Sequence, residues 1–276
     1  MDQPNRDLSA RAWISPLTVL GANVEIGAGS IINGHCKIGD HCQIGAGVVL
    51  DPGSGDASIV VETGARIMAA ATIAGPVHIS RGALVQPGAV VVRSVPPHAI
   101  VSGNPAQITG YTTVGTDSVH VPGIHPPETP GTMATRVKGV TLHRLPKVLD
   151  LRGNLTVGEF GRTLPFEAKR YFMVFGVPNA EVRGEHAHRI CHQFLVCVHG
   201  SCSVVADDGR ARDEFELDDP SIGLHLPPLT WGIQYKYSHD AVLLVFASEF
   251  YDCAEYIRSY EEFLKLASSK STREPA

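Results

Sequence analysis

The stretch ISPLTVLGANVEIGAGSIINGHCKIGDHCQIGAGVVL, residues 14–50, repeats every six residues. A large aliphatic side chain opens each repeat, and a small or slender one follows four positions later. The aliphatic positions are Ile14, Leu20, Ile26, Ile32, Ile38, Ile44 and Leu50, and the series resumes at Ile67, Ile73, Ile79, Val85 and Val91. This period is typical of a parallel β-helix, in which each rung supplies one large and one small side chain to a narrow interior. We therefore expect the first hundred residues to form a coil of short parallel strands.

The period breaks once, over the segment DPGSGDASIVVETGAR at residues 51–66. We expect this segment to leave the coil as a loop, where binding functions are common. Cys36 and Cys42 fall at small inward positions of consecutive rungs. We interpret them as packing residues and not nucleophiles, because apolar burial raises the pKa of a thiol.

Length and composition bound the rest of the chain. Its 276 residues predict two domains. A formal charge of −5 does not favour nucleic-acid binding. No apolar run approaches the ~18 residues that predict a membrane span. The polar start MDQPNRDLSARAW has no apolar stretch typical of a secretory signal, so we expect the protein in the reducing cytoplasm. The six cysteines contain no C-x-x-C pair, and we expect them to be free thiols.

The chain changes character after residue 111. Residues 112–136 are dense in Pro, Gly and Thr, and we interpret them as a linker between a first domain, 1–111, and a second, 137–276. Short β-like runs with turn signals then predict an antiparallel cupin or jelly-roll barrel. Helical spacing over 251–267 predicts a closing amphipathic helix. The fold class is therefore all-β with one C-terminal helix.

The segment PPHAIVSGNPA at residues 96–106 closes the repeats. With these repeats, residues 13–110 resemble the left-handed β-helix acyltransferases. The resemblance implies a left-handed coil, a trimer, or a hexamer if the barrels also pair, and acetyl-CoA bound along the seam between solenoids. It also implies CoA contacts at Ser102, Gly103, Asn104 and Pro105.

Acetyl transfer to an amine needs the unprotonated amine, which a histidine can provide as general base. The candidates in the solenoid are His35, His41 and His78. His35 and His41 occupy the same position of consecutive rungs, so both cannot address one seam. We favour His35, with a solvated surface histidine as the alternative for each.

The densest chemistry in the second domain is RGEHAHRICHQ, residues 183–193. Alternate strand residues face one way, so His186 and His188 are expected to share one side of the sheet. Gln193 stands where a metal-binding cupin usually has Glu, and the later turn Pro227–Gly232 has no histidine. We therefore expect no metal, and interpret the pair as proton-transfer groups, or alternatively as core histidines.

Two further residues have open interpretations. Arg183 is a candidate clamp for phosphate oxygens or a solvated arginine at the barrel rim. Trp231 is a candidate stacking platform for a base or sugar, or a core tryptophan.

The motif R-G-x-H-A-H, the later Gln193 and the ending D-A-V-L-L-V…Y-I-R-x-Y-x-x-F resemble the nucleotide-sugar 3,4-ketoisomerases over residues 137–267. The whole chain resembles WxcM-like fusions of such an isomerase with an N-acetyltransferase. The isomerase resemblance implies cofactor-free proton transfer by His186 and His188. It also implies that substrate contacts come from Arg170, Tyr171, Arg183, Gln193 and Trp231.

Together the resemblances imply a bifunctional enzyme of dTDP-3-acetamido-3,6-dideoxyhexose synthesis. The barrel would convert a dTDP-4-keto-6-deoxyhexose to its 3-keto isomer, a separate PLP aminotransferase would install the amine, and the solenoid would acetylate it. Three alternatives remain open: a barrel that only binds nucleotide sugar, a metal-dependent cupin oxygenase, and a solenoid that only trimerises active barrels.

Overall fold

The computed structural model describes residues 12–112, 126–178 and 181–271. The chain divides into two compact units, Met1–Thr112 and Thr113–Ala276. The first is a parallel β-helix and the second a two-sheet barrel with one α-helix, which confirms the predicted all-β fold class. In the described ranges, no helix is long and apolar enough to cross a membrane.

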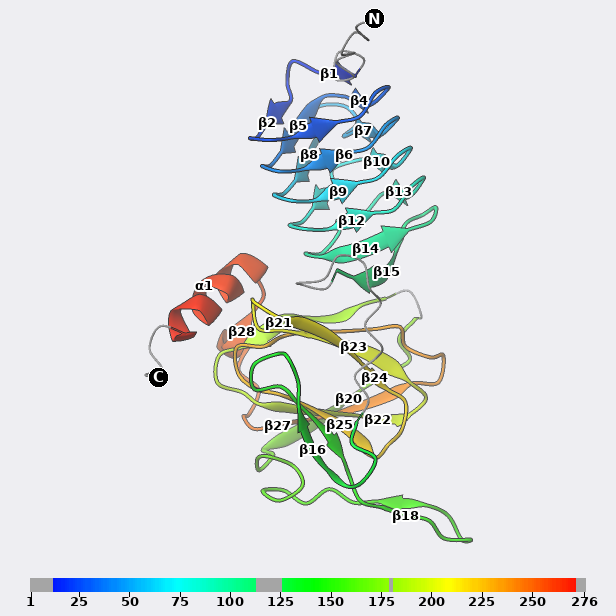
Figure 1. Ribbon diagram of the computed structural model, residues 1–276, viewed down its shortest axis with the longest axis vertical. Helices are drawn as coiled ribbons and strands as arrows, with labels where there is room; N and C mark the ends of the chain where they lie inside the picture. Colours follow the sequence, from blue (N-terminus) through cyan, green and yellow to red (C-terminus); the bar gives the residue numbers. More distant parts are fainter. Residues whose placement is uncertain (1–11, 113–125, 179–180, 272–276) are drawn as a thin grey trace, which may run out of the picture. The chain divides into compact units, whose positions relative to one another are not determined.

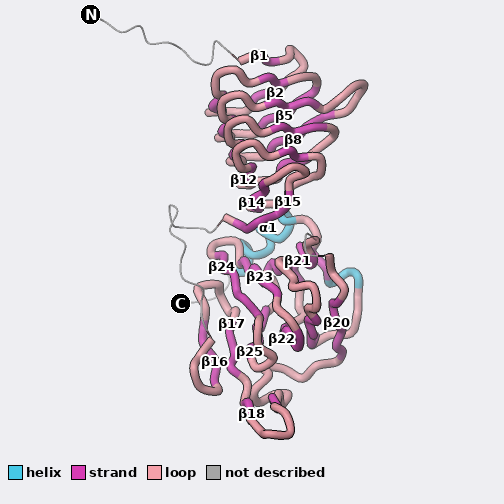
Figure 2. The backbone as a smooth tube through the Cα atoms, turned by 90° about the vertical axis from the view of Figure 1, so that its right-hand side faces the viewer, coloured by secondary structure: helices cyan, strands magenta, loops and turns pink. Residues whose placement is uncertain are grey.

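Short strands of the first unit stack as rungs into three sheets (Figure 1), and loops separate them at every corner (Figure 2). The first sheet contains β1 (Trp13–Ile14), β4 (Ile31–Ile32), β7 (Val49–Asp51), β10 (Thr72–Ala74) and β13 (Val90–Val91). The second contains β2 (Val19–Leu20), β5 (His35–Ile38), β8 (Ser58–Val61) and β11 (His78–Ile79). The third contains β3 (Glu25–Ile26), β6 (Gln43–Ile44), β9 (Arg66–Ile67), β12 (Leu84–Val85), β14 (Ala99–Ser102) and β15 (Gln107–Tyr111).

The solenoid interior follows the six-residue period. Ile32, Leu50, Ile73 and Val91 lie above one another inside the first sheet, and all are buried. Cys36 and Cys42 are buried as well, and burial is the main cause that raises the pKa of each thiol, to about 11 for Cys36. Both cysteines are therefore packing residues, as the spacing predicts.

Glycine at the corners has a steric cause. A Cβ added to Gly45 would lie 2.5 Å from the backbone nitrogen of Ala69 in the next coil. Successive coils approach so closely at this corner that no side chain fits between them.

The expectation that residues 51–66 leave the coil is wrong for most of the segment. Ser58–Val61 forms β8, which pairs in parallel with β5 on one side and β11 on the other. Ile59 and Val61 point inward and are buried. The excursion is therefore limited to residues 52–57, because the chain regains its inward aliphatic positions directly after them.

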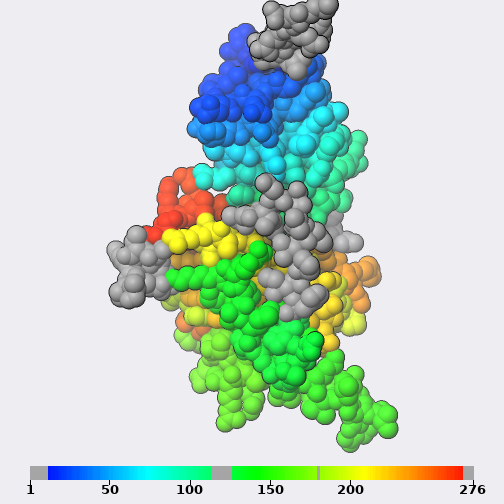
Figure 3. Space-filling model, in the orientation of Figure 1, coloured from blue at the N-terminus to red at the C-terminus, as the bar shows by residue number. Residues whose placement is uncertain are grey.

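The barrel of the second unit consists of two main sheets and a small hairpin. The larger sheet has the order β16 (Gly131–Ala134), β17 (Thr141–Arg144), β25 (Ile222–Leu226), β22 (Gln193–His199), β27 (Val242–Ala247) and β20 (Arg170–Phe175). The smaller has the order β24 (Arg212–Leu217), β23 (Cys202–Asp207), β26 (Trp231–Tyr235), β21 (Arg183–His188) and β28 (Tyr256–Ile257). A hairpin of β18 (Lys147–Val148) and β19 (Leu155–Thr156) projects from the barrel surface (Figures 1 and 3).

Two predicted boundaries need correction. Residues 131–134, placed in the linker, form β16, which pairs with β17 through backbone hydrogen bonds despite its lack of apolar alternation. The predicted helix over 251–267 begins only at Tyr260, as α1 (Tyr260–Ser271). Before it lie a 3₁₀ turn, Cys253–Glu255, and strand β28, because Tyr256 and Ile257 pair with β21. Tertiary pairing overrides the local helical spacing there.

The larger sheet is buried on both faces. Its inner face packs on the smaller sheet through residues such as Leu142, Leu195 and Leu243. Its outer face carries Phe194 and Val196, packed with Leu145, Leu164 and the partly buried Phe166. Residues 193 and 194 therefore point to opposite faces of the sheet, which separates the two histidine groups of the barrel.

Three histidines lie on that outer face. His192 and His225 stack with ring centroids 5.2 Å apart, and Nδ1 of His192 lies 2.9 Å from Nε2 of His225. Thr141 Oγ1 bridges to His225 and to Nε2 of His143. Burial is the first cause that lowers the pKa of His143, and it lowers that of His225 to about 4. His143 and His225 are therefore neutral at pH 7 and pack against Phe194 and Phe166.

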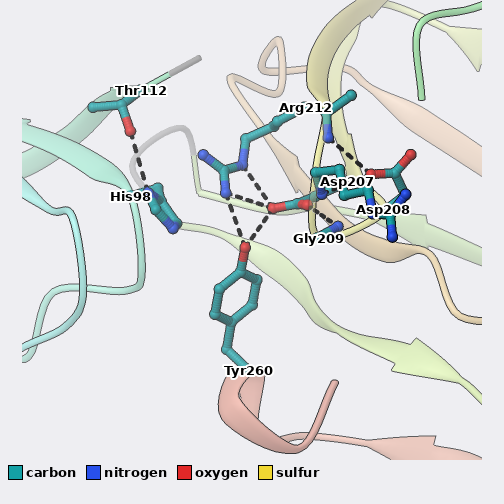
Figure 4. Close-up of polar contacts among 9 residues, drawn as sticks. His98, Thr112, Asp207, Asp208, Gly209, Arg212 and Tyr260 are labelled. Atoms are coloured by element: carbon teal, nitrogen blue, oxygen red, sulfur yellow. Dashed lines mark hydrogen bonds and ion pairs between the residues drawn. The ribbon is translucent and has the colours of Figure 1, made fainter. Parts of the chain in front are cut away.

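Helix α1 is tied to the β23–β24 hairpin by a buried ion pair (Figure 4). The Asp207 carboxylate accepts hydrogen bonds from Arg212 Nε at 2.8 Å and from the Tyr260 hydroxyl at 2.6 Å. The other carboxylate oxygen accepts from the backbone N–H of Gly209. Because both oxygens are satisfied, the ion pair is a structural anchor for α1.

Candidate active sites

The two histidines of the R-G-x-H-A-H motif lie side by side on β21. Their ring centroids are 5.0 Å apart and the ring planes are nearly perpendicular. Ala187, between them in sequence, points to the opposite side and is fully buried. The period-2 alternation of the strand thus brings both imidazoles together, as expected.

A bulge in β21 brings Arg183 to the same side. The pairing with β26 shifts register between Gly184 and His186, and Glu185 has a left-handed φ of 52°. Arg183 pairs with Gln234 and His186 with Gly232, so residues three apart share a face. A Cβ on Gly184 would lie 2.6 Å from the carbonyl oxygen of Gly232, so the motif needs glycine there.

Both rings carry their proton on Nδ1, but their hydrogen bonds use different nitrogens. His186 Nδ1 lies 2.8 Å from the carbonyl oxygen of Gly184, which can only accept, so Nδ1 carries the proton and Nε2 the lone pair. The Nε2 amide of Gln193 lies 3.2 Å from Nε2 of His188 and donates to it, which leaves the proton on Nδ1. Within the described residues, this buried Nδ1 of His188 has no hydrogen-bond partner. One ring offers a base and the other an acid.

Both rings are neutral at pH 7. Burial is the main cause that lowers the pKa of His186. It also lowers the pKa of His188 to about 3, with further contributions from His186, Arg170 and Arg258. The positive field of the two arginines that disfavours an imidazolium also stabilises an anion formed between them.

Aromatic and cationic side chains surround the pair. The ring of Tyr256 lies 4.9 Å from that of His186 and 4.4 Å from that of His188, between centroids. Arg258 covers Tyr256 at 4.7 Å, and Arg170 lies 5.5 Å from the ring of Tyr251. Sequence reasoning missed Tyr251, Tyr256 and Arg258 as site residues, because their segment reads as a helix. The motif Y-I-R at residues 256–258, which resembles the ketoisomerases, was the sequence signal that could have identified these residues.

The remaining predicted contacts divide into two groups. Arg170 and Gln193 lie at the histidine pair, and Arg183 lies exposed on its face of the sheet. Tyr171 points away: it is 65% exposed, because alternation on β20 turns Arg170 and Phe172 inward and Tyr171 outward. Trp231 is also placed away from the pair.

Trp231 is a core residue. It is 4% exposed and packs against Tyr260 and Phe263 of α1. Its neighbour Gly232 pairs with His186, so alternation directs Trp231 to the other side of the sheet. The structure therefore supports the core interpretation of this tryptophan and not the stacking platform.

No group of three or more His, Cys, Asp or Glu side chains is arranged to hold a metal ion within residues 12–112, 126–178 and 181–271. At the barrel site, the side-chain amide of Gln193 donates a hydrogen bond to His188.

The solenoid histidines occupy different settings. His35 is exposed on the outer side of β5, and His41 lies in a turn with a left-handed φ of 57°. His78 lies on β11, and its Nε2 is 2.8 Å from Oε1 of Glu62. Of the predicted CoA contacts, Ser102 ends β14, and Gly103, Asn104 and Pro105 lie in the turn that leads to β15.

Residues 138–268 match the family described as WxcM-like, C-terminal, and residues 17–52 match the bacterial transferase hexapeptide, six repeats. A TDP-4-oxo-6-deoxy-alpha-D-glucose-3,4-oxoisomerase of Aneurinibacillus thermoaerophilus is 42% identical over 119 residues, 43% of this chain and 86% of that protein. A solved sugar 3,4-ketoisomerase of Thermoanaerobacterium thermosaccharolyticum, in complex with TDP, is 34% identical, with a TM-score of 0.47. The match covers 48% of this chain and 97% of that one.

The solenoid has relatives of its own. Serine acetyltransferase 4 of Arabidopsis thaliana is 35% identical over 103 residues, 36% of this chain, and the chain spans only 29% of that protein's length. A hexapeptide-repeat solenoid joined to a barrel with a neutral histidine pair defines an enzyme with an acyltransferase-type and an isomerase-type domain. Through its second unit, the chain belongs to the WxcM-like family of TDP-sugar 3,4-oxoisomerases.

Proposed function

We propose that the barrel isomerises a dTDP-4-keto-6-deoxyhexose to the 3-keto sugar, and that the solenoid N-acetylates the derived dTDP-3-amino sugar with acetyl-CoA. The observation that carries the isomerase proposal is a pair of neutral rings that engage different nitrogens in hydrogen bonds: His186 keeps the Nε2 lone pair and His188 keeps Nδ1–H for the substrate. Isomerisation needs both a base and an acid near adjacent carbons, and one protein site supplies the two.

In this mechanism Nε2 of His186 removes the proton on C3, which is acidic because C4 is a ketone. Electrons move into the C3–C4 bond, and Nδ1–H of His188 protonates the oxygen on C4. The O3 proton then passes to His188 as the C3–O bond becomes a ketone, while C4 takes the proton held by His186. Both rings return to their starting tautomers, and the net change is a shift of one hydrogen from C3 to C4 and one from O3 to O4.

The cations around the pair fit this chemistry. Arg170 and Arg258 lower the pKa of His188 through their positive charge, and the same charge stabilises the enediolate. Arg183, exposed beyond the bulge, is available to the diphosphate of the nucleotide. The face on which C4 is reprotonated decides between gluco and galacto products.

Proton NMR of dTDP-4-keto-6-deoxyglucose in deuterated buffer tests the proposal. We expect loss of the C3 proton signal and appearance of a 3-keto species with this enzyme alone. A barrel that only binds nucleotide sugar would leave the spectrum unchanged, and an oxygenase would consume O₂ and depend on added iron.

The assembly proposed for the solenoid is a trimer, or a hexamer if the barrels also pair. The outward side of the first solenoid sheet carries an apolar row, Trp13, Ile31, Val49, Thr72 and Val90, aligned by the parallel register. Trp13 and Ile31 are exposed in the single chain. A neighbouring solenoid covering this row would form the seam in which acetyl-CoA contacts the turn at Ser102–Pro105.

The order of reactions follows from the chemistry. A 3-keto sugar must become a 3-amino sugar before it can be acetylated, so a PLP-dependent aminotransferase is the proposed partner between the two steps. The cysteines of the described residues are free thiols, which suits a cytoplasmic enzyme working beside an acetyl-CoA pool. One of the outer histidines, His35, His41 or His78, would accept the proton of the amine.

A further inference from the structure

A histidine–carboxylate pair lies on the outer side of the second solenoid sheet. His78 on β11 and Glu62, which directly follows β8, are joined by a 2.8 Å contact between Nε2 and Oε1. Both side chains are about half exposed, at 46% and 40%, so a ligand on this wall can reach them. The pair forms across adjacent coils, because β11 stacks on β8 in parallel.

The surrounding backbone holds both groups in place. The N–H of Arg81 donates to Oε2 of Glu62 at 2.8 Å, so each carboxylate oxygen has a donor. The N–H of His78 donates to Oγ of Ser94 at 3.1 Å. With Nε2–H directed at Glu62, the lone pair of the neutral ring lies on Nδ1. The pair therefore has the composition of an oriented general base.

The other solenoid histidines lack this support. In the described part of the chain, neither His35 nor His41 has a carboxylate partner, and His41 lies in a left-handed turn. His35 shares the outer side of the same sheet, where it pairs with Ser58, one strand from His78. Lys37 lies in the same row of the sheet as His78, with Val60 between them, and Arg81 follows β11; both are cations and neither replaces the carboxylate.

We infer that His78 is the general base of acetyl transfer and that Glu62 is its positioning residue, an inference that rests on the proposed acetyl transfer. The acceptor is the primary amine of a nucleotide-linked amino sugar. Its nitrogen attacks the thioester carbonyl, the C–S bond breaks, and an amide forms. The amine proton passes to Nδ1 of His78 and from there to the departing CoA thiolate, so the products are the amide and the free thiol.

The test measures thiol release from acetyl-CoA with a dTDP-3-amino-3,6-dideoxyhexose as acceptor, using the full chain. We expect His78→Asn to lower kcat about 10²- to 10⁴-fold, the usual contribution of a general base. Isomerisation by the same polypeptide serves as the folding control and is expected to stay unchanged. His199→Asn is the matched control, since it removes an exposed histidine–aspartate pair of the barrel and leaves the solenoid unchanged.

Glu62→Gln tests the positioning role. Glutamine can still accept from the N–H of Arg81, but its amide lacks the second carboxylate oxygen that fixes Nε2–H of His78, so kcat should fall about tenfold or more while KM for acetyl-CoA stays within about twofold. A purely structural role would change KM together with kcat.

The outcomes are separable. If wild-type enzyme transfers no acetyl group, the proposed function of the solenoid fails. If the wild-type enzyme does transfer acetyl groups, two results overturn the assignment of the base. One is a His78→Asn rate within about twofold of wild type, and the other is a large loss in His35→Asn instead. An unchanged kcat in Glu62→Gln, or a KM that changes together with kcat, overturns the role of Glu62.

Discussion

The side-chain amide of Gln193 donates to Nε2 of His188 across 3.2 Å in the barrel interior. Gln193 lies on β22 of the larger sheet and His188 on β21 of the smaller one, so the contact bridges the two sheets. A glutamine is uncharged at every pH, whereas a carboxylate would attract a proton to the ring. Burial is the main cause that keeps His188 neutral, and the residue type at position 193 holds its proton on Nδ1.

Gln193→Glu is expected to lower isomerase kcat about tenfold or more, because a carboxylate favours the imidazolium or the wrong tautomer of His188. The pH–rate profile of isomerisation measures the effect, with acetyl transfer by the same chain as the control. An unchanged rate and profile would show that position 193 does not set the state of His188.

His186→Asn and His188→Asn are expected to differ in one measurement. His186→Asn removes the base and should lower the rate of deuterium exchange at C3 about 10²- to 10⁴-fold. His188→Asn removes the acid and should slow isomerisation more than it slows exchange. Proton NMR in deuterated buffer follows both. His199→Asn is a matched control, since His199 is exposed and contacts only Asp240 among the described side chains. Equal exchange in wild type and His186→Asn would refute the assigned base.

The buried ion pair of Figure 4 predicts a graded loss of barrel stability. Tyr260→Phe removes the hydrogen bond that the hydroxyl donates to Asp207 and the one that it accepts from Arg212, and should cost about 1.5–3 kcal/mol. Asp207→Asn leaves Arg212 buried without its counter-charge and should cost about 3–5 kcal/mol. Urea unfolding of the barrel measures both. Lys236→Gln breaks an exposed pair with Glu214 and should change stability by about 1 kcal/mol or less, so an equal effect of all three would contradict the anchor role.

Acid should destabilise the barrel through its buried histidines. The pKa of His225 falls from 6.5 to about 4 on folding, so the unfolded chain binds more protons between these values. This contribution to stability is complete above pH 6.5 and is lost as the pH falls towards 4, by about 1.4 kcal/mol per pH unit. Unfolding free energies at pH 7.5, 6 and 5 should show the decline, and His225→Gln should flatten it. A slope unaffected by the substitution would exclude His225 as its source.

The apolar row on the first solenoid sheet predicts the effect of a single charge on assembly. Ile31→Asp places a carboxylate within the proposed seam, where burial without a partner is costly. Light scattering should report a smaller assembly than wild type, with loss of acetyl transfer and retained isomerisation. A wild-type-sized assembly would mean that another face forms the contact.

The sequence by itself determined the solenoid, the barrel that follows it and the alternation that places His186 beside His188. Each depends on a short period or on neighbours along the chain, and such local patterns need no knowledge of distant pairing. The same local reasoning assigned the wrong extent to the loop after Leu50, because a rung is recognised as regular only when β5 and β11 stack on it.

Only the tertiary structure decided the composition of the sites. Tyr256 reaches the histidines because β28 pairs with β21, although the local spacing of its segment indicates a helix. Trp231 is buried because α1 covers its side of the sheet, and Glu62 becomes a partner of His78 through the stacking of coils. These contacts join residues far apart in the chain, so strand register and burial establish them, and no local pattern carries that information.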